Sequence, residues 1–473
     1  MAGRSDNGSN GHDQHDAAIG GDLAGDAVQR LIEAGVQVVD LLFSDITGGT
    51  KALTIPVTLL PEAMARGYRF DGSALTGGDR RTELDLFLVP DATTMVLIPT
   101  DLFGNDGRPR GRLYCSVRRS DGQPFPGDPR SALERVLVRA AAAGFDYRVA
   151  LEIEYYLLKT PDGGLGEGQP FASLAPRPSR AGGYFGIGED MITATRDEIV
   201  AALQSLGVGV GGGHHETGPG QEELDLLPAG GIRMADQIMT VRQVIRSVAQ
   251  RRGFQATFMP KPFTDAAGSG MHLFQQVAHY PGGGDALRDE RNDGGDDLSA
   301  TARYLIAGQL AHAPGMCAIL APTVNSYKRL AAGHRAPRHA RWARVGESSL
   351  IRVPNGIAGE PIQLELRNPD AMANPYLALA VAISCGLDGI EHAEEPPYPL
   401  DESLVAYDDA ELERLGTPKL PMSLGDALTA MSEDDVIRSA LGDYIFEQLL
   451  SVKRAEWDDF RRDVSPWEHA RYL

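Results

Sequence analysis

Two glutamates separated by one isoleucine occur in the run Val149-Ala150-Leu151-Glu152-Ile153-Glu154-Tyr155-Tyr156, which is otherwise apolar or aromatic. Side chains alternate between the two faces of a β-strand, so a strand here places both carboxylates on one face. Burying paired carboxylates costs free energy unless a cation neutralises them, and divalent cations do this best. A solvated surface strand is the alternative, but the apolar flanks disfavour it. The run therefore predicts a core strand with a metal site on one face.

Three further segments have the composition of a site for hard cations and phosphate. One runs from His214-His215-Glu216 through Gly218-Pro219-Gly220 to Gln221-Glu222-Glu223. The others are Gly268-Ser269-Gly270-Met271-His272 and Gln363-Leu364-Glu365-Leu366-Arg367-Asn368-Pro369-Asp370. Five glutamates and a histidine suit two Mg²⁺ or Mn²⁺ ions, because hard cations prefer oxygen ligands and tolerate one imidazole, whereas zinc sites rely on cysteine and histidine. Paired metal ions bind phosphate oxygens, so these segments indicate phosphoryl transfer.

The composition is that of an acidic globular protein. The chain has 473 residues, a formal net charge of −20 and 42% hydrophobic residues, which is enough for two domains and a large core. The strong negative charge makes nucleic acid an unexpected partner. A membrane is not expected either, since the chain has no apolar run long enough to span one and no signal peptide. Three widely spaced cysteines argue for a reducing compartment, so we expect a cytoplasmic protein.

Eight short segments follow one another along the chain: Phe70-Asp71-Gly72-Ser73, Leu88-Val89-Pro90-Asp91, Gly182-Gly183-Tyr184-Phe185, His214-His215-Glu216, Thr257-Phe258-Met259-Pro260-Lys261-Pro262, Gly268-Ser269-Gly270-Met271-His272, Asn325-Ser326-Tyr327-Lys328-Arg329-Leu330 and Asn374-Pro375-Tyr376-Leu377. In these segments and their order, the sequence from about Val36 to the C-terminus resembles type I glutamine synthetase. A single short motif arises by chance, but eight in order do not.

The resemblance implies an α+β fold with an N-terminal β-grasp domain and a catalytic domain, in which helices flank a curved antiparallel sheet. We expect a disordered tail at residues 1–20, the β-grasp domain at 21–120 and the catalytic domain at 121–473. The resemblance further implies a homo-oligomer, a dodecamer of two stacked rings. Its active sites lie between one subunit's catalytic domain and its neighbour's β-grasp domain.

Local patterns predict the elements independently of the resemblance. Apolar periodicity and turn residues predict a short β-rich region, a linker, a helix and several C-terminal helices. In order, these are a helix near 27–34, strands at 36–43, 50–56 and 85–99, a linker at 118–128, a helix at 131–143, an acidic Gly-rich surface insertion at 282–297 and helices over 425–473.

The implied chemistry is the ATP-dependent joining of glutamate to ammonia. ATP phosphorylates the γ-carboxylate of glutamate, and ammonia then attacks the acyl phosphate. The resemblance assigns Glu154, Glu216 and Glu223 to one metal ion and Glu152, His272 and Glu365 to another, with two or three Mg²⁺ or Mn²⁺ ions per site.

Six further residues match functional positions of the family. Arg329 matches the arginine that holds the α-carboxylate of glutamate, and Gly268 lies in the loop that borders this substrate. Arg367 matches an arginine near the γ-carboxylate and phosphate, whereas Arg352 matches one that touches the nucleotide phosphates. The last two belong to the ammonium pocket: Asp71, offered by the neighbouring subunit, and Tyr184.

Two departures from the family pattern fall close together. Gly333-His334-Arg335-Ala336-Pro337 puts Arg335 where the family has a flap glutamate that takes a proton from ammonium. Arginine stays protonated at any usable pH and cannot act as this base. Twelve residues later, Glu347 replaces a phosphate-facing arginine. The changes are opposite in sign, so we interpret them as a charge swap in which Arg335 and Glu347 pair or reshape one end of the pocket.

Three smaller losses lie nearby: Gln363 replaces an arginine, Ala267 an asparagine and Ala74 a serine. Relatives that join glutamate to organic amines also commonly lack the flap glutamate. The leading hypothesis is therefore a ligase that forms a γ-glutamyl amide with an organic amine. The alternatives are glutamine synthetase proper, with ammonia as substrate, and a catalytically weak homologue with a sensing or structural role.

Overall fold

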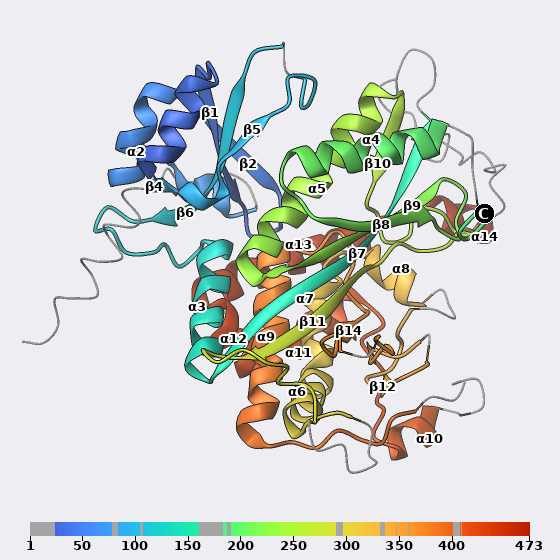
Figure 1. Cartoon of the computed structure of the whole chain (residues 1–473). Coiled ribbons are helices and arrows are strands. Elements are labelled where there is room, and N and C mark those ends of the chain that lie inside the picture. Colours follow the sequence, from blue (N-terminus) through green and yellow to red (C-terminus); the bar gives the residue numbers. More distant parts are fainter. Residues whose placement is uncertain are drawn as a thin grey trace, which may run out of the picture.

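The computed structural model describes residues 24–77, 84–104, 107–159, 183–186, 191–289, 297–331, 336–346, 348–357, 359–400, 407 and 409–473. Figure 1 shows a smaller N-terminal part beside a larger part that holds most of the helices. The tail expected at residues 1–20 lies outside the described ranges, as do Arg335 and Glu347.

A six-stranded sheet forms the core of the N-terminal part. Its path runs β2-β1-β6-β4-β3, with β5 paired to β6. The pairing of β1 with β6 is parallel and the other pairings are antiparallel. A helix over residues 24–33 and helix α2 (Leu60–Arg66) accompany the sheet. The strands are β1 (Val38–Ser44), β2 (Thr50–Pro56), β3 (Tyr68–Asp71), β4 (Asp85–Pro90), β5 (Val96–Ile98) and β6 (Arg110–Arg118).

An eight-stranded sheet forms the centre of the larger part. Its path runs β12-β13-β14-β11-β7-β9-β8, with β10 paired to β7. The short β12–β13 pair is parallel, which departs from the expected all-antiparallel sheet. The strands are β7 (Phe145–Lys159), β8 (Val210–His215), β9 (Gln221–Gly230), β10 (Phe254–Thr257), β11 (Met271–His279), β12 (Trp342–Ala343), β13 (Ile351–Arg352) and β14 (Leu364–Leu366).

Helices surround this second sheet (Figure 1). The most deeply buried is α9 (Pro375–His392), an almost wholly apolar helix that packs against α3, α5 and α6. The other helices are α3 (Pro129–Ala142), α4 (Met191–Ser205), α5 (Gly231–Arg251), α6 (Ala300–Ala311), α7 (Ala313–Leu320), α8 (Ser326–Ala331), α10 (Asp409–Arg414), α11 (Leu424–Ser432), α12 (Asp435–Leu441), α13 (Asp443–Arg462) and α14 (Pro466–Tyr472).

Strand β7 is the core strand that the glutamate pair predicts. Leu151, Ile153 and Tyr155 are each no more than 1% exposed and belong to the largest apolar cluster. Glu152 and Glu154 alternate with them and are partly exposed on the opposite face. The period of two therefore separates the hydrophobic core from a carboxylate-bearing face, as expected for a half-buried strand.

Buried polar contacts join the two parts of the chain. The Asn374 amide donates to the Asp45 carbonyl oxygen at 2.9 Å, while its Oδ1 accepts from the first backbone N–H groups of α9. The Arg130 guanidinium pairs with Asp91 of the N-terminal part at 2.7 Å and with Asp236 of α5 at 3.1 Å. Charge-assisted bonds of this kind are directional, so they fix how the two parts meet.

Within the described ranges, no helix combines the length and the apolar character needed to cross a membrane.

Candidate active site

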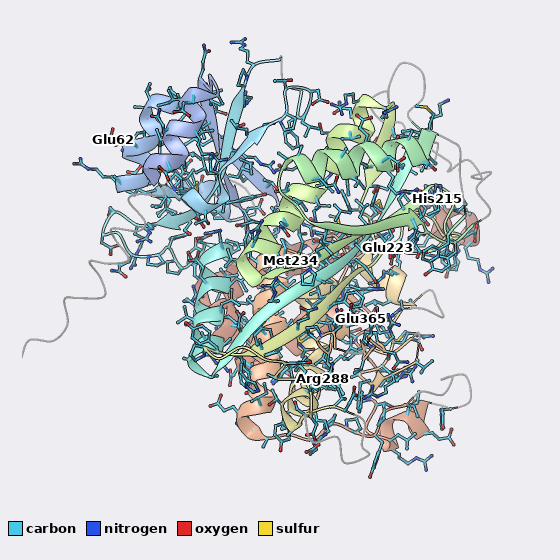
Figure 2. The ribbon with its side chains drawn as sticks, in the orientation of Figure 1. Glu62, His215, Glu223, Met234, Arg288 and Glu365 are labelled. Carbon is cyan, nitrogen blue, oxygen red and sulfur yellow. The ribbon has the colours of Figure 1, made fainter. Side chains whose placement is uncertain are left out.

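One cavity collects nearly all of the side chains that the sequence singles out. It has a volume of about 900 Å³ and lies over the carboxylate-bearing face of β7, β9, β11 and β14. Figure 2 labels two of its lining residues, Glu223 of β9 and Glu365 of β14, in the larger part of the molecule. Of the residues predicted to bind metal, substrate or nucleotide, those that line it are Glu152, Glu154, Glu216, Glu223, His272, Glu365, Gly268, Arg329, Arg352, Arg367 and Tyr184.

The first group of possible metal ligands consists of Glu152, His272 and Glu365. His272 lies opposite Glu152 in the β7–β11 ladder, and β14 pairs with the other edge of β11. His272 Nδ1 is 3.2 Å from Glu152 Oε2 and 3.2 Å from Glu365 Oε1. The three potential ligand atoms all lie within 4.8 Å of one another, a spacing that one cation can bridge.

The charges of this group are strongly coupled. Burial lowers the pKa of His272, but hydrogen bonds to Glu152 and Glu365 outweigh burial and raise it to about 9. Burial likewise acts to raise the pKa of Glu365, but the hydrogen bond with His272 and the nearby arginine charges lower it to about 2. The raised pKa favours a protonated imidazole beside these carboxylates, and a divalent ion that binds His272 would compete with that proton.

The second group lies on the neighbouring strands. His214, Glu216 and Glu223 also bring three potential ligand atoms within 4.8 Å of one another. His214 Nε2 is 3.2 Å from Glu223 Oε1, and this hydrogen bond raises the pKa of His214 to about 9. The backbone N–H of Thr217 donates to a Glu216 carboxylate oxygen at 2.5 Å.

Glu154 lies beside the second group. It pairs in register with Glu223, and the Gln221 amide donates to its Oε2 at 2.9 Å. Burial raises the pKa of Glu154 to about 7, with Glu223 and Glu216 acting in the same direction. A carboxylate with this pKa is one that a bound cation would stabilise in its charged form.

Two members of the possible ligand groups were not among the predicted metal ligands. Asp225 forms a third group with Glu152 and Glu223, and His214 belongs to the second group. The signal was present in both cases. Asp225 follows Glu223 by two residues and so shares its face of β9, and His214 stands in the quoted His-His-Glu segment.

Two arginines hold Glu365 from opposite sides. Arg352 lies opposite Glu365 in the β13–β14 register, and its Nε donates to Oε2. Arg367 Nη1 donates to Oε1 at 2.8 Å. Glu365 is fully buried, so these charge-assisted bonds offset the cost of its desolvation. Both arginines also line the cavity.

Arg329 is anchored by the backbone. Its Nη1 donates to the carbonyl oxygens of Asn368 and Pro369 at 3.0 and 3.1 Å, and its Nη2 donates to that of Arg367 at 3.0 Å. A Cβ atom on Gly268 would stand 2.8 Å from Arg329 Cγ. Glycine is therefore required for this loop to pass over the arginine, which explains the geometry of the Gly-Ser-Gly segment.

An aromatic pair forms part of the cavity wall. Tyr184 and Phe185 line the cavity while 53% and 62% exposed, and the Phe185 ring stacks on His214 with centroids 4.0 Å apart. Phe185 has a backbone φ of 58°, an unusual value for a large side chain. The backbone N–H of Phe185 donates to the His215 carbonyl oxygen at 3.1 Å, which ties the segment to β8.

Asp71 is the one predicted site residue in the described ranges that the cavity lining does not include. Its side chain accepts the backbone N–H groups of Ser73 and Leu84 at 3.0 and 3.2 Å. It ends β3, in the N-terminal part that Figure 1 shows at the upper left, away from β8, β9 and β14. Arg335 and Glu347, the proposed charge swap, lie outside the described residues.

The donor set fits divalent cations of the hard type. The first two groups supply four carboxylates and two imidazoles, and Glu154 and Asp225 add two more carboxylates to the cavity lining. One oxygen of Asp225 is buried and has no hydrogen-bond partner among the described residues. Oxygen-rich sites of this kind suit Mg²⁺ or Mn²⁺, which neutralise charge that the fold leaves in excess.

Comparison with known families decides the relationship. The family profile described as "Glutamine synthetase, catalytic domain" matches residues 126–472, and the profile "Glutamine synthetase, beta-Grasp domain" matches residues 35–120. The chain belongs to the glutamine synthetase family. Members of this family are ATP-dependent ligases that form C–N bonds, and they use divalent metal ions.

Similar proteins extend over almost the whole chain. A glutamine synthetase of Halobacterium salinarum is 37% identical over 449 residues, which cover 94% of this chain and 96% of the relative. One of Staphylococcus aureus is 38% identical over 443 residues, covering 93% and 96%. The family and the predicted fold of the glutamine synthetase type are therefore confirmed.

Solved structures show the same fold. A GmaS–ADP complex aligns with a TM-score of 0.79 at 29% identity, covering 94% of this chain and 99% of the other. A GmaS structure without ligand gives 0.79 at 30% identity with the same coverage. A structure described as a novel glutamine synthase homologue gives a TM-score of 0.76 at 27% identity, covering 92% and 97%.

Proposed function

We propose that this glutamine synthetase family member joins the γ-carboxylate of glutamate to an organic amine. The reaction has two steps. The γ-carboxylate oxygen attacks the γ-phosphorus of ATP, and ADP leaves. The amine nitrogen then attacks the carbonyl carbon of the γ-glutamyl phosphate, phosphate leaves, and the nitrogen loses a proton. The observation that carries the ligase chemistry is the convergence of all six predicted metal ligands and three arginines on one cavity.

The cavity residues supply positioning and charge for these steps. Arg329, held by three carbonyl oxygens, is placed to bind a carboxylate of glutamate. Arg352 and Arg367 pair with Glu365 and line the cavity, where they would stabilise the transferring phosphoryl group. Two or three Mg²⁺ or Mn²⁺ ions, held by the carboxylates and by His272, would supply further neutralisation of the phosphate oxygens.

The amine proposal is carried by Arg335. Arginine cannot take the proton that ammonium must lose before it attacks, so a base at this position is missing. The cavity wall is consistent with a larger, less polar nucleophile. Ala267, Ala336, Tyr184 and Phe185 are among its lining residues, and the two aromatic residues are more than half exposed. An alkyl substituent would gain apolar contact there. Glu216, or Asp71 of a neighbouring subunit, would accept the amine proton.

We further propose that the protein is a homo-oligomer, a dodecamer with its active sites between subunits. The support is the position of Asp71, which lies outside the lining of the cavity in its own chain. A neighbouring subunit would bring its Asp71 to the open side of the cavity.

The test is ADP release with ATP, Mg²⁺, glutamate and a panel of nucleophiles. The panel holds ammonia, a monoalkylamine, a diamine and an amino alcohol, with product mass measured in parallel. We expect at least one organic amine to give a higher kcat/KM than ammonia, and a product with the mass of a γ-glutamyl amide. Reactions without glutamate, and with a Glu154→Ala variant, are the controls.

Glutamine synthetase proper is the second candidate, and the names and full-length coverage of the relatives favour it. It predicts that ammonia exceeds every organic amine in the panel, which would overturn the amine proposal. Hydroxylamine distinguishes the third candidate, a catalytically weak homologue, from the two ligases. It converts any γ-glutamyl phosphate that the protein forms into a hydroxamate, which can be measured. Absence of hydroxamate and of ADP release with all nucleophiles would show that the protein does not catalyse the reaction.

A further inference from the structure

Strand β8 carries residues that line the cavity, but few of its own side chains can fix its position in the sheet. It is the edge strand of the eight-stranded sheet and contains three successive glycines, Gly211, Gly212 and Gly213. Its pairing with β9 shifts register between Val210 and Gly212. Register is weakly specified in glycine-rich strands, because they lack side chains that must face the core. A slip of one residue would turn His215 instead of His214 toward the cavity.

The face of β8 and β9 opposite the cavity holds a compact polar cluster. Glu222 is fully buried and pairs with His215 Nδ1 through one carboxylate oxygen. Arg196 Nη1 of α4 pairs with the other oxygen at 2.8 Å. Thr193, one turn earlier on α4, places its Oγ1 3.2 Å from His215 Nε2. The cluster therefore connects helix α4 to both strands.

The two faces are coupled by adjacent residue pairs. His215 lies opposite Glu222, and His214 lies opposite Glu223. The first pair joins the polar cluster, whereas the second lines the cavity with His214 Nε2 3.2 Å from Glu223. The same register therefore does two things. It pairs the buried Glu222 with His215 on the face away from the cavity, and it brings His214 beside Glu223 on the cavity face. The ladder continues into the cavity rim, where the Glu216 N–H donates to the Gln221 carbonyl oxygen at 2.9 Å.

We propose that Arg196 is a positioning residue for the cavity: by holding the buried Glu222 against His215, it fixes the register of β8 on β9. A buried carboxylate must be paired. In the present register Glu222 has an imidazole from β8 and a guanidinium from α4. The Arg196 stem also crosses Gly213, where an added Cβ would lie 3.3 Å from Arg196 Cδ. A side chain that cannot reach substrate thereby determines where His214, Glu216 and Glu223 stand.

The test measures Mn²⁺ binding directly. Electron paramagnetic resonance gives the concentration of free Mn²⁺, and the bound Mn²⁺ is expressed per protein subunit. Arg196→Met should weaken Mn²⁺ binding about 10-fold or more, as expected when support behind metal ligands is lost. Arg196→Lys keeps the charge and should retain part of the affinity. Arg252→Met is the matched control, because Arg252 also holds α4, through Glu198, but from the end of α5. It should leave Mn²⁺ binding close to that of the parent protein.

A double variant, Arg196→Met with Glu222→Met, separates register from charge balance. It removes both buried charges, so it should fold even where Arg196→Met alone fails. We expect its Mn²⁺ affinity to remain low, because the buried ion pairs behind β8 are then absent. Recovery of the parent affinity would overturn the proposal.

A crystal structure of the double variant gives a readout independent of metal binding. We expect β8 to be displaced from its present register, and His214 still opposite Glu223 would overturn the positioning role. The Mn²⁺ readout rests on the proposed function, whereas the register readout does not. A parent protein without Mn²⁺ affinity would therefore contradict the proposed function, and the crystal structure alone would decide the role of Arg196.

Discussion

Glu154 is central to the cavity although it belongs to none of the compact three-residue groups. It lies opposite Glu223 in register and shares its face of β7 with Glu152. We expect Glu154→Ala to lower kcat for ADP release by at least about 100-fold. Phosphoryl transfer depends on cations that neutralise the phosphate charge, and carboxylates such as Glu154 would hold these cations in place. Steady-state ADP release at saturating Mg²⁺ and ATP measures this effect.

Glu62→Ala is a suitable control for this variant. Glu62 is an exposed carboxylate of α2, and Figure 2 shows it in the N-terminal part, far from Glu223 and Glu365. Its removal should leave turnover unchanged. Near-native turnover in Glu154→Ala would refute the assignment of this face of β7 to the metal site.

The charge swap predicts how two substitutions combine. Arg335→Glu alone should not confer efficient ammonia use, because the new carboxylate would face Glu347 as a like charge. Arg335→Glu together with Glu347→Arg should raise kcat/KM for ammonia above both the parent and the single variant. A double-mutant cycle on kcat/KM measures the coupling. A double variant no better than the single one would show that the two positions do not interact.

At the residue scale, the sequence predicts the members of the cavity better than their arrangement. Glu152 and Glu154 are found because a period of two on a strand is a strong local signal. The local pattern places Asp225 on the face of Glu223 and His214 near Glu216, but their convergence with the other carboxylates depends on register between strands. Local patterns carry no information about which strand pairs with which. The roles of the individual site residues stay predictions.

At the level of secondary-structure elements, His312 connects the junction of α6 and α7 to two further helices. It stands between α6 and α7, and its ring lies 2.7 Å from Asp434, the N-cap of α12, and 3.1 Å from Asp388 of α9. Burial lowers the pKa of His312, but hydrogen bonds to Asp434 and Asp388 outweigh it. They raise the pKa from 6.5 to about 9. A protonated His312 therefore holds the two carboxylates together.

This pKa gives the cluster a defined pH dependence. Because the folded-state pKa is raised, its stabilisation is fully present below about pH 6.5 and is lost as pH rises through 9. His312→Gln should therefore cost about 1–2 kcal/mol of unfolding free energy at pH 6, after allowance for partial exposure, and much less at pH 10. Urea denaturation at the two pH values measures the difference.

His392→Gln is the comparison for the same carboxylate. His392 also approaches Asp388, but its side chain is 61% exposed, so it should change stability little at either pH. If His312→Gln were equally destabilising at pH 6 and pH 10, packing rather than charge would explain its effect.

Elements were predicted well where their signals are local. Helix α3 was expected at 131–143 and begins at Pro129, because Asp128 accepts the N–H groups of Arg130 and Ser131 as an N-cap. The strand region at 85–99 is instead divided by a 3₁₀ turn at Ala92–Thr94. Asp91 caps this turn and pairs with Arg130, a contact between distant segments that periodicity cannot reveal.

At the scale of the whole molecule, the position of Asp71 requires explanation. The contacts of Asn374 and Arg130 fix the N-terminal part against its own catalytic part, in an arrangement that leaves Asp71 outside the cavity lining. If Asp71 acts on substrate, it must act in the cavity of a neighbouring subunit. Cyclic oligomers with head-to-tail contacts provide this geometry, because each subunit presents one surface to the next.

Subunit mixing tests this arrangement. Asp71→Asn and Glu154→Ala should each be poorly active alone. Mixed oligomers should regain activity, because an intact site forms wherever an Asp71→Asn catalytic part meets the N-terminal part of a Glu154→Ala neighbour. Random mixing of equal amounts in a closed ring restores about a quarter of the sites. Mixing Glu154→Ala with Glu216→Ala is the matched control, since both changes damage the catalytic part and no combination yields an intact site. Equal recovery in the two mixtures, or none in the first, would show that Asp71 does not serve a neighbour's cavity.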